Sequence, residues 1–296
     1  MTERRPLDAG AVATMVLLAS IWGFTQVAAK LAANDISVVM QGALRSIISV
    51  ALLLGWAYWH RIPLFARDGT WWPGVVAGAL YAAEFFFIYA GLAYTSASRM
   101  VVFAYLAPVL TAVGVHLFVA GEKLVGIQWL GVAFAFAGIA VAFGDGFLSD
   151  PSSLLGDAFG IIAAFLWAAT TVVIRTTSLA SATASKTLFY QVAIAALILP
   201  LASFLMGEPG VIAITPIAIA SIAFQGIIVS FASHLAWFWL LTRFLAARLA
   251  AFSSLAPLFG VLGGVLVLGE PLRPQFAFAA GLVILGIYLV NRRSGS

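Results

Sequence analysis

The chain has 296 residues, of which 63% are hydrophobic and 9% are charged, whereas soluble globular domains average roughly 45–50% apolar and 25% charged residues. This composition excludes an ordinary soluble protein and indicates one that is dissolved in a lipid bilayer. Because cysteine is absent, disulfides, thiol catalysis and cysteine-ligated metals are excluded as well. The net charge of +4 does not indicate nucleic-acid binding, since the basic residues gather at predicted helix ends, where membrane topology accounts for them.

Ten segments are long and apolar enough to cross a hydrocarbon core of roughly 30 Å, which takes about 20 helical residues. Transmembrane β-strands are shorter and alternate in polarity, so the predicted class is an all-α integral membrane protein. The first segment ends at Lys30 without a clear signal-peptide cleavage pattern, and we interpret it as a membrane span. The predicted spans are 10–31, 36–59, 71–94, 97–120, 124–144, 153–175, 184–206, 214–242, 245–268 and 274–291.

Lysine and arginine residues predict the orientation of these spans. With the N-terminus inside, eleven of the 15 lie on the cytoplasmic side and three on the outer side, and Arg45 lies inside the second span. Because cytoplasmic loops carry the excess of positive charge, we expect both termini in the cytoplasm. The longest polar break, residues 144–156, then falls on the outer side between the fifth and sixth spans.

The second half of the chain repeats the first. Because each half has an odd number of spans, the two copies are predicted to be inverted, as residues 1–146 and 147–296 of one membrane domain. Inverted repeats that enclose a site near the midplane are typical of secondary transporters. The repeated residues are Arg99, Phe103, Leu106, Ala107, Pro108 and Gly114, which recur 149 positions later as Arg248, Phe252, Leu255, Ala256, Pro257 and Gly263.

Further features repeat in the same way. A Gly-Glu-x-Leu sequence starts at Gly121 and again at Gly269, and the first span of each half carries a tryptophan, Trp22 and Trp167. With these motifs, and with the Leu-Ala-Pro of spans four and nine, residues 10–291 resemble the drug/metabolite transporter superfamily in its EamA branch. The length and the aromatic content of the spans are most similar to the bacterial exporters of aromatic amino acids and methyl viologen.

This resemblance implies a secondary transporter of the bacterial inner membrane that exports small amphipathic metabolites by alternating access to a midplane cavity. Amino acids, including aromatic ones, are the favoured substrates, and coupling to protons is left open. Carriers of drugs, quaternary cations or nucleotide sugars are the alternatives within transport. The sequence contains no cluster of basic residues deep in span nine that would hold the phosphate of a nucleotide sugar.

Aromatic residues are predicted to line the cavity. Tyr81, Phe85 and Tyr89 repeat at i, i+4 and i+8 and so share one helix face. Aromatic rings can hold a planar side chain by stacking or a cation by cation–π attraction; the alternative is ordinary apolar packing. The predicted substrate-binding rings are Trp22, Tyr81, Phe85, Tyr89, Tyr105, Trp167 and Trp237.

Polar residues inside the spans are further candidates, because ionisable groups in a membrane are costly and default to functional hypotheses. Glu84 is the only carboxylate deep in a span, and we consider that it binds a substrate ammonium or carries a proton, or that it forms a structural ion pair with Arg45 at similar depth. Gln26 and Thr171 are candidates for binding a substrate amide or carboxylate, although a threonine can equally bond its own helix.

The eighth span carries a polar stripe. Gly226, Ser230, His234 and Trp237 follow α-helical spacing, so we expect them on one face. On that face His234 would hydrogen-bond a substrate or carry a proton near neutral pH, or else it is a packing histidine that is satisfied internally.

Pro108 and Pro257 are interpreted as hinges, since a proline inside a helix removes one backbone hydrogen bond and kinks it. Glu122 and Glu270 stand at predicted helix ends, where capping is favoured over transport chemistry.

Enzyme motifs are missing, and the three histidines are too scattered for a metal site. We therefore expect no enzyme activity and no cofactor, and we expect a small-molecule substrate and the lipid bilayer as partners. An intramembrane enzyme or a channel is the alternative from a different class. It has little support, because a water-lined polar file and a paired nucleophile and base are both lacking.

Overall fold

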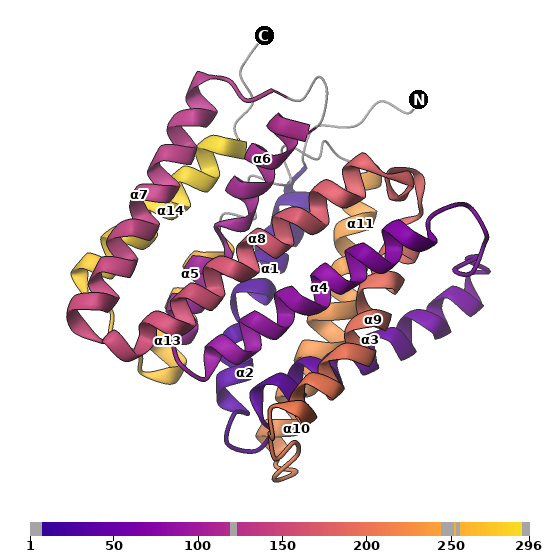
Figure 1. The fold of residues 1–296 in the computed structure, drawn as a ribbon, viewed down its shortest axis with the longest axis horizontal. Helices are drawn as coiled ribbons and strands as arrows, with labels where there is room; N and C mark the ends of the chain where they lie inside the picture. Colours follow the sequence, from indigo (N-terminus) through magenta and orange to yellow (C-terminus); the bar gives the residue numbers. More distant parts are fainter. Residues whose placement is uncertain (1–7, 119–122, 244–251, 253–254, 292–296) are drawn as a thin grey trace.

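The computed structural model describes residues 8–118, 123–243, 252 and 255–291, and this part of the chain is helical, with a single isolated bridge between Ile36 and Val211 (Figure 1). The helices are α1 (Ala9–Gly23), α2 (Thr25–Leu31), α3 (Val38–Trp59), α4 (Trp71–Leu92), α5 (Ala97–Ala104), α6 (Ala107–Phe118), α7 (Gly126–Ser149), η1 (Pro151–Ser153), α8 (Leu154–Thr176), η2 (Ser178–Ser181), α9 (Ala184–Leu205), α10 (Pro216–Ala223), η3 (Phe224–Ser233), α11 (His234–Arg243), α13 (Ala256–Leu268) and α14 (Pro274–Asn291).

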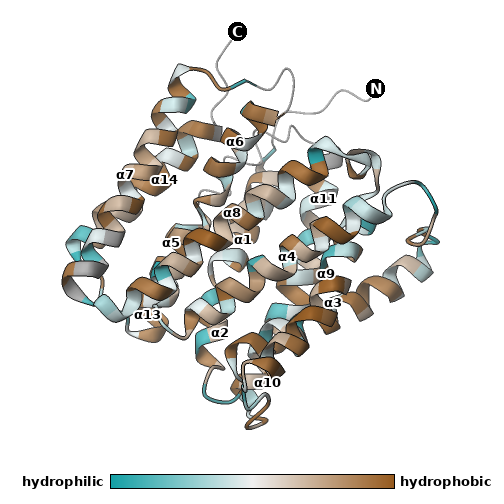
Figure 2. Ribbon diagram, in the orientation of Figure 1, coloured by the Kyte–Doolittle hydropathy of each residue, from teal (hydrophilic) through white to brown (hydrophobic). Residues whose placement is uncertain are grey.

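The prediction of an all-α membrane protein is confirmed. In the described part of the chain, seven helical segments are long and apolar enough to cross a membrane, and three shorter apolar helices lie at Gly126–Ala142, Ala256–Leu268 and Pro274–Val290. These segments overlap all of the predicted spans. Hydrophobic residues cover the lengths of the helices, and hydrophilic residues gather at the connections between them (Figure 2).

Side-chain oxygens at the start of several helices explain where those helices begin. Asp8, Ser96, Thr183 and Thr215 precede α1, α5, α9 and α10, and each accepts a hydrogen bond from the backbone N–H three residues on, at 2.7, 3.2, 3.3 and 3.1 Å. Such caps satisfy N–H groups that have no partner within the helix. Pro216 follows its cap at the first helical position, where a missing N–H costs nothing.

Several spans are interrupted in their interiors. The first breaks at Phe24 between α1 and α2, and the fourth at Tyr105 between α5 and α6. Pro108 and Pro257 are the second residues of α6 and α13. Each proline therefore lies at the start of a helix, and not at a bend within a continuous helix as predicted. The eighth span contains a π-helical segment, η3, between α10 and α11.

Helices from the two halves of the chain pack in pairs. α3 contacts α9, α5 contacts α13 and α7 contacts α14, while α4 lies against both α8 and α9. In Figure 1, α7 and α14 run side by side at one edge of the molecule, and α3, α4 and α9 lie together at the opposite edge. Two large apolar clusters follow this division, one centred on α5, α6, α7, α13 and α14 and the other on α3, α4 and α9.

Two glycines allow α7 and α14 to approach closely. A Cβ atom built on Gly286 would lie 2.6 Å from the carbonyl oxygen of Gly131, and a Cβ atom on Gly131 would lie 2.8 Å from the carbonyl oxygen of Gly286. Lipid chains are as apolar as the side chains they would replace, so helix association in a membrane depends on such close van der Waals packing of small residues.

We therefore expect Gly286→Val to destabilise the protein, because the added side chain collides with the backbone of α7. Overpacking of this kind costs about 1–3 kcal/mol. Thermal unfolding of the purified protein in detergent measures the effect. Gly281→Val on the same helix is the matched control, since no atom lies within 4 Å of a Cβ built on Gly281; equal melting temperatures for the two variants would contradict the prediction.

Candidate functional site

The predicted rings of α4 surround a buried arginine. Arg45 on α3 is 1% exposed, and its guanidinium carbon lies 4.1 Å from the centroid of the Phe85 ring. Its Nη1 and Nη2 atoms lie 3.5 Å from the hydroxyl oxygens of Tyr89 and Tyr81. The ring centroids of Tyr81 and Phe85 are 4.6 Å apart, and those of Phe85 and Tyr89 are 6.3 Å apart. The three rings therefore share the face that their spacing predicts.

Glu84 lies beside this group without joining it. The side chain is 4% exposed and is within electrostatic range of Arg45, Tyr81 and Tyr105. The expected salt bridge with Arg45 is not among the ion pairs of the described residues. Neighbouring residues of an α-helix are about 100° apart around the axis, so Glu84 is turned away from the face of α4 on which Phe85 contacts Arg45.

A chain of side-chain amides continues the polar network toward the second half. The Tyr89 hydroxyl donates a short hydrogen bond to Oε1 of Gln225 in η3. Nε2 of Gln225 donates to Oε1 of Gln41 at 3.0 Å, and Nε2 of Gln41 donates to the carbonyl oxygen of Ala29 at 3.0 Å. Gln41 and Gln225 were not among the predicted site residues, although each is a neutral amide inside an apolar span, as Gln26 is.

A second group of predicted residues forms where α1 meets α11. The Trp22 indole N–H donates to the hydroxyl of Ser233 at 2.9 Å. The rings of Trp22 and Trp237 make an edge-to-face contact, with centroids 5.7 Å apart and an interplanar angle of 75°. Such geometry is the favoured one for aromatic pairs. Two predicted rings that are 215 residues apart in the sequence therefore meet.

A third group lies at the break between α5 and α6. The rings of Tyr105 and Trp167 are edge-to-face with centroids 5.6 Å apart. The Thr171 hydroxyl donates to the carbonyl oxygen of Trp167 at 3.1 Å, which is the alternative in which a threonine bonds its own helix. Gln26 is buried, and its Oε1 atom has no hydrogen-bond partner among the described residues.

The single polar stripe expected on the eighth span is wrong. The expectation assumed α-helical spacing throughout, whereas Phe224–Ser233 is π-helical and has more residues per turn. A Cβ on Gly226 would face Ile48 of α3, and the Ser230 carbonyl accepts from Ser49 of α3. Trp237 instead contacts Trp22 of α1, so Trp237 does not share the side of the span that Gly226 presents to α3.

His234 is the first residue of α11, directly after the π-helical segment. Its Nδ1 atom lies 3.0 Å from the carbonyl oxygen of Val229. A carbonyl oxygen only accepts hydrogen bonds, so Nδ1 carries the proton, and in the neutral ring Nε2 is an acceptor.

At the predicted outer end, two carboxylates cap helices of the opposite half. Glu270, from the second Gly-Glu-x-Leu, accepts hydrogen bonds from the backbone N–H groups of Ala97 and Ser98 at 2.7 and 2.9 Å and from the Ser98 hydroxyl at 2.5 Å. Glu208 accepts from the first N–H groups of α3 at 3.0 and 3.1 Å. The predicted capping role of Glu270 is confirmed, with a helix of the other half; Glu122 and Arg248 lie outside the described residues.

Ion pairs flank the interior at both ends. Arg99 on α5 contacts Asp157 of α8 at 2.5 Å and Asp145 of α7 at 3.3 Å. At the predicted cytoplasmic end, Lys186 contacts Asp68 at 2.7 Å. Hydrogen bonds from Lys186 and from the Thr70 hydroxyl lower the pKa of Asp68 to about 2.

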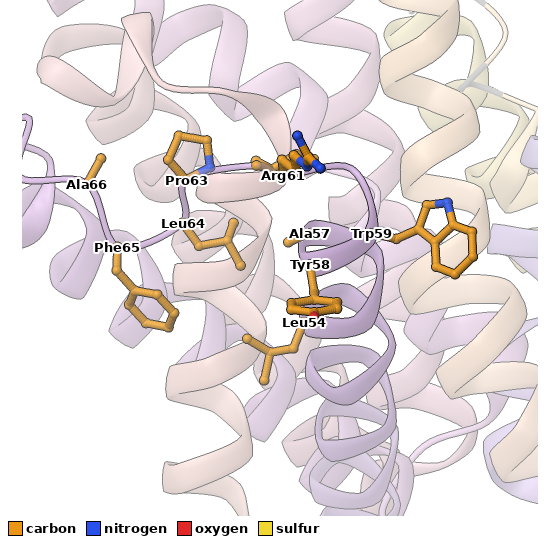
Figure 3. A pocket seen from close by; sticks show the side chains of 10 residues that line it. Leu54, Ala57, Tyr58, Trp59, Arg61, Pro63, Leu64, Phe65 and Ala66 are labelled. Carbon is orange, nitrogen blue, oxygen red and sulfur yellow. The ribbon is translucent and has the colours of Figure 1, made fainter.

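A surface hollow of about 970 Å³ lies at the connection between α3 and α4 and contains none of the predicted substrate-binding residues (Figure 3). Tyr58 and Trp59, which help to line it, are 88% and 83% exposed. Exposed aromatic residues near span ends are typical of the membrane–water boundary, and we assign this hollow to that boundary.

The fold and these buried groups define a polytopic helical membrane protein with a polar and aromatic interior. The described residues contain no cluster of three or more possible metal ligands. The sequence profile of the EamA-like transporter family matches the chain twice, over residues 10–144 and 154–292. The chain belongs to this family, and it is a transporter rather than an enzyme.

Relatives cover nearly the whole chain. An uncharacterized transporter of Archaeoglobus fulgidus is 27% identical over 289 residues, which are 94% of this chain and 98% of the relative. A protein of Escherichia coli named as a probable amino-acid metabolite efflux pump is 22% identical, covering 95% and 93%. A solved crystal structure at 19% identity covers 95% of this chain and 97% of its own, with a TM-score of 0.67, which shows a shared fold.

The hydrogen bond between Tyr89 and Gln225 generates a prediction. We expect Tyr89→Phe and Gln225→Leu each to cost about 1–3 kcal/mol, because each leaves a buried polar partner unsatisfied. The double variant should cost less than the sum of the two single variants, since residues in one network are coupled. Unfolding of the four proteins in detergent measures the coupling. Gln225→Leu combined with the distant Ser153→Ala is the control pair; additive losses for Tyr89 and Gln225 would show that the bond does not form.

Proposed function

We propose that the protein is a secondary transporter that exports small metabolites, with amino acids, including aromatic ones, as the favoured substrates. It works by alternating access in the bacterial inner membrane, with both termini in the cytoplasm. Family membership supports transport, and the name of the Escherichia coli relative, a probable amino-acid metabolite efflux pump, supports amino-acid efflux. The observation that carries the proposal is the buried group of Arg45, Glu84 and aromatic rings inside apolar helices, which are the places where membrane transporters hold polar substrates.

Two inverted five-helix halves are part of the proposal. The family profile matches each half separately, and the observed pairs α3–α9, α5–α13 and α7–α14 join the second, fourth and fifth predicted spans of one half to those of the other. Such pairing of equivalent helices is what a two-fold axis in the membrane plane would produce.

The proposed substrate site uses the three aromatic groups. A planar substrate side chain would stack on three sets of rings: Trp22 with Trp237, Tyr105 with Trp167, and the rings of α4. The polar groups that we propose for the substrate are the unpartnered Oε1 of Gln26, the Nε2 of His234, the Thr171 hydroxyl and Glu84.

Alternating access needs an end that closes and reopens. In this structure the predicted outer end is held by the caps from Glu270 and Glu208, which join the second half to helices of the first. We propose that the helix starts at Pro108 and Pro257 act as the hinges when this end opens.

A carrier of quaternary cations is the second candidate, and Glu84 beside aromatic rings favours it. Arg45 opposes it, because a buried guanidinium repels a second cation at the same place.

Uptake into proteoliposomes tests the proposal. Radiolabelled phenylalanine, tryptophan, threonine and a quaternary ammonium cation are supplied with and without an imposed proton gradient. We expect saturable transport of phenylalanine and tryptophan. Transport of the cation alone would replace the favoured substrate class, and identical rates with and without the gradient would exclude proton coupling.

We expect Trp22→Ala and Trp167→Ala to raise the KM for tryptophan by about 2- to 30-fold, which corresponds to the loss of a stacking or cation–π contact of about 0.5–2 kcal/mol. Trp59→Ala is the matched control, since its ring is exposed at the membrane boundary. Concentration-dependent uptake by equal amounts of reconstituted protein measures KM. Unchanged KM for both interior variants would remove these rings from the substrate site.

The caps generate a prediction about opening. The chain has no cysteine, so Val101→Cys introduces a single thiol at a position buried between α5 and α13. We expect Glu270→Ala to speed the labelling of this thiol by a membrane-impermeant maleimide from the outer side about tenfold or more, because two backbone donors and one hydroxyl lose a charged acceptor.

Asp150→Asn is the control for this measurement, since among the described residues the Asp150 side chain accepts a hydrogen bond only from Ser152 in its own loop. Equal labelling rates with and without Glu270 would mean that this cap does not hold the outer end closed.

A further inference from the structure

We propose that Arg45 and Glu84 together bind the charged head group of a free α-amino acid, Arg45 receiving the carboxylate and Glu84 the ammonium group. This inference rests on the proposed function and narrows its substrate class to zwitterions. It assigns a role to Arg45 that its sequence position alone does not indicate, since the sequence predicted for Arg45 only a structural ion pair with Glu84.

Arg45 differs from the other buried cations of the described chain. Arg99 contacts the carboxylates of Asp157 and Asp145, and Lys186, which is 3% exposed, contacts Asp68. Arg45 is more deeply buried than either, yet within the described residues no carboxylate lies within the 4.0 Å of a salt bridge. A buried charge is normally paired, so the protein leaves a place for an anion.

The guanidinium also has hydrogen-bonding capacity to spare. It has five N–H donors, and the described contacts use two of them, both at 3.5 Å. That distance is beyond the usual 2.7–3.2 Å of an N–H···O bond. The face of the guanidinium lies on the Phe85 ring, which leaves its edge for the two parallel hydrogen bonds that a carboxylate accepts from arginine.

Glu84 supplies the opposite charge at a distance. It has no hydrogen bond or ion pair among the described residues, and it is the neighbour in sequence of Phe85, whose ring contacts the Arg45 guanidinium. A guanidinium and a carboxyl group that lie on neighbouring faces without a salt bridge between them can each contact a molecule that carries both charges. The carboxylate and ammonium groups of an α-amino acid are attached to one carbon atom, so a single ligand can contact both partners.

The rings around Arg45 determine which substrate side chain fits beside this head group. Phe85 lies between Tyr81 and Tyr89, and the Tyr89 hydroxyl is fixed by Gln225. An amino acid held by Arg45 would therefore place its side chain among aromatic surfaces, in agreement with a preference for aromatic amino acids. A quaternary cation or a decarboxylated amine lacks the group that Arg45 needs.

Competition between phenylalanine and 2-phenylethylamine, which lacks only the carboxylate, tests the assignment. In proteoliposomes the wild-type protein should transport phenylalanine in preference to the amine. We expect Arg45→Gln to reduce this preference by about 10- to 100-fold, the range for losing hydrogen bonds to a charged group. The preference is a ratio within one preparation, so a variant that folds in lower yield still gives the answer.

Three further variants complete the test. Arg45→Lys keeps the charge without the paired geometry and should restore part of the preference for phenylalanine. Glu84→Gln should weaken transport of phenylalanine relative to N-acetylphenylalanine, which has no ammonium group. Lys186→Gln removes a buried cation that already has a carboxylate partner, and it should leave both ratios unchanged.

The two proposals fail in different ways. If the wild-type protein transports no amino acid, the proposed function is overturned. If it transports phenylalanine and Arg45→Gln keeps the full preference over the amine, Arg45 is a structural cation and the assignment of the head-group site is overturned.

Discussion

The positive charge of Arg45 is the constraint on which the interior depends. A guanidinium inside a bilayer costs several kcal/mol unless neighbours offset it. Here the neighbours are neutral: two tyrosine hydroxyls and the face of Phe85. Tyr89 is in turn held by Gln225 and Gln41, so helices α3, α4 and η3 are joined by one polar network. The network holds the charge in place without neutralising it, which is the arrangement that the proposed head-group site needs.

The sequence predicted what depends on local periodicity. The all-α class and the common face of Tyr81, Phe85 and Tyr89 follow from residue spacing and from the chemistry of single residues. The bond between Gln225 and Gln41 joins positions 184 residues apart, and no local pattern encodes it. The same is true of the cap that Glu270 supplies to α5. Only the three-dimensional packing of the halves creates these contacts.

The polar stripe predicted on the eighth span failed because residue spacing alone does not reveal the type of helix. Apolar and polar residues fit an α-helical stripe, yet Phe224–Ser233 forms a π-helix. In that segment the Gln225 side chain bonds Tyr89, Gln41 and Ser221, and Gly226 packs against Ile48. These tertiary contacts stabilise a backbone conformation that is otherwise uncommon. π-Helices are rare in proteins, and those that occur lie frequently at functional sites. A sequence pattern cannot report a register that is set by partners on another helix.

Helix α5 connects the outer end to the aromatic interior. Its first residues are held by Glu270, and Arg99 in its first turn is held by Asp157 and Asp145. Its last residue is followed by Tyr105, which contacts Trp167. Eight helical residues span only about 12 Å, and the helix ends at a break rather than continuing into α6. A rigid segment of this length moves as one body, so release of the caps at its start would shift Tyr105 at its end. Helix α5 alone would therefore be enough to couple opening of the outer end to the position of Tyr105 in the proposed substrate site.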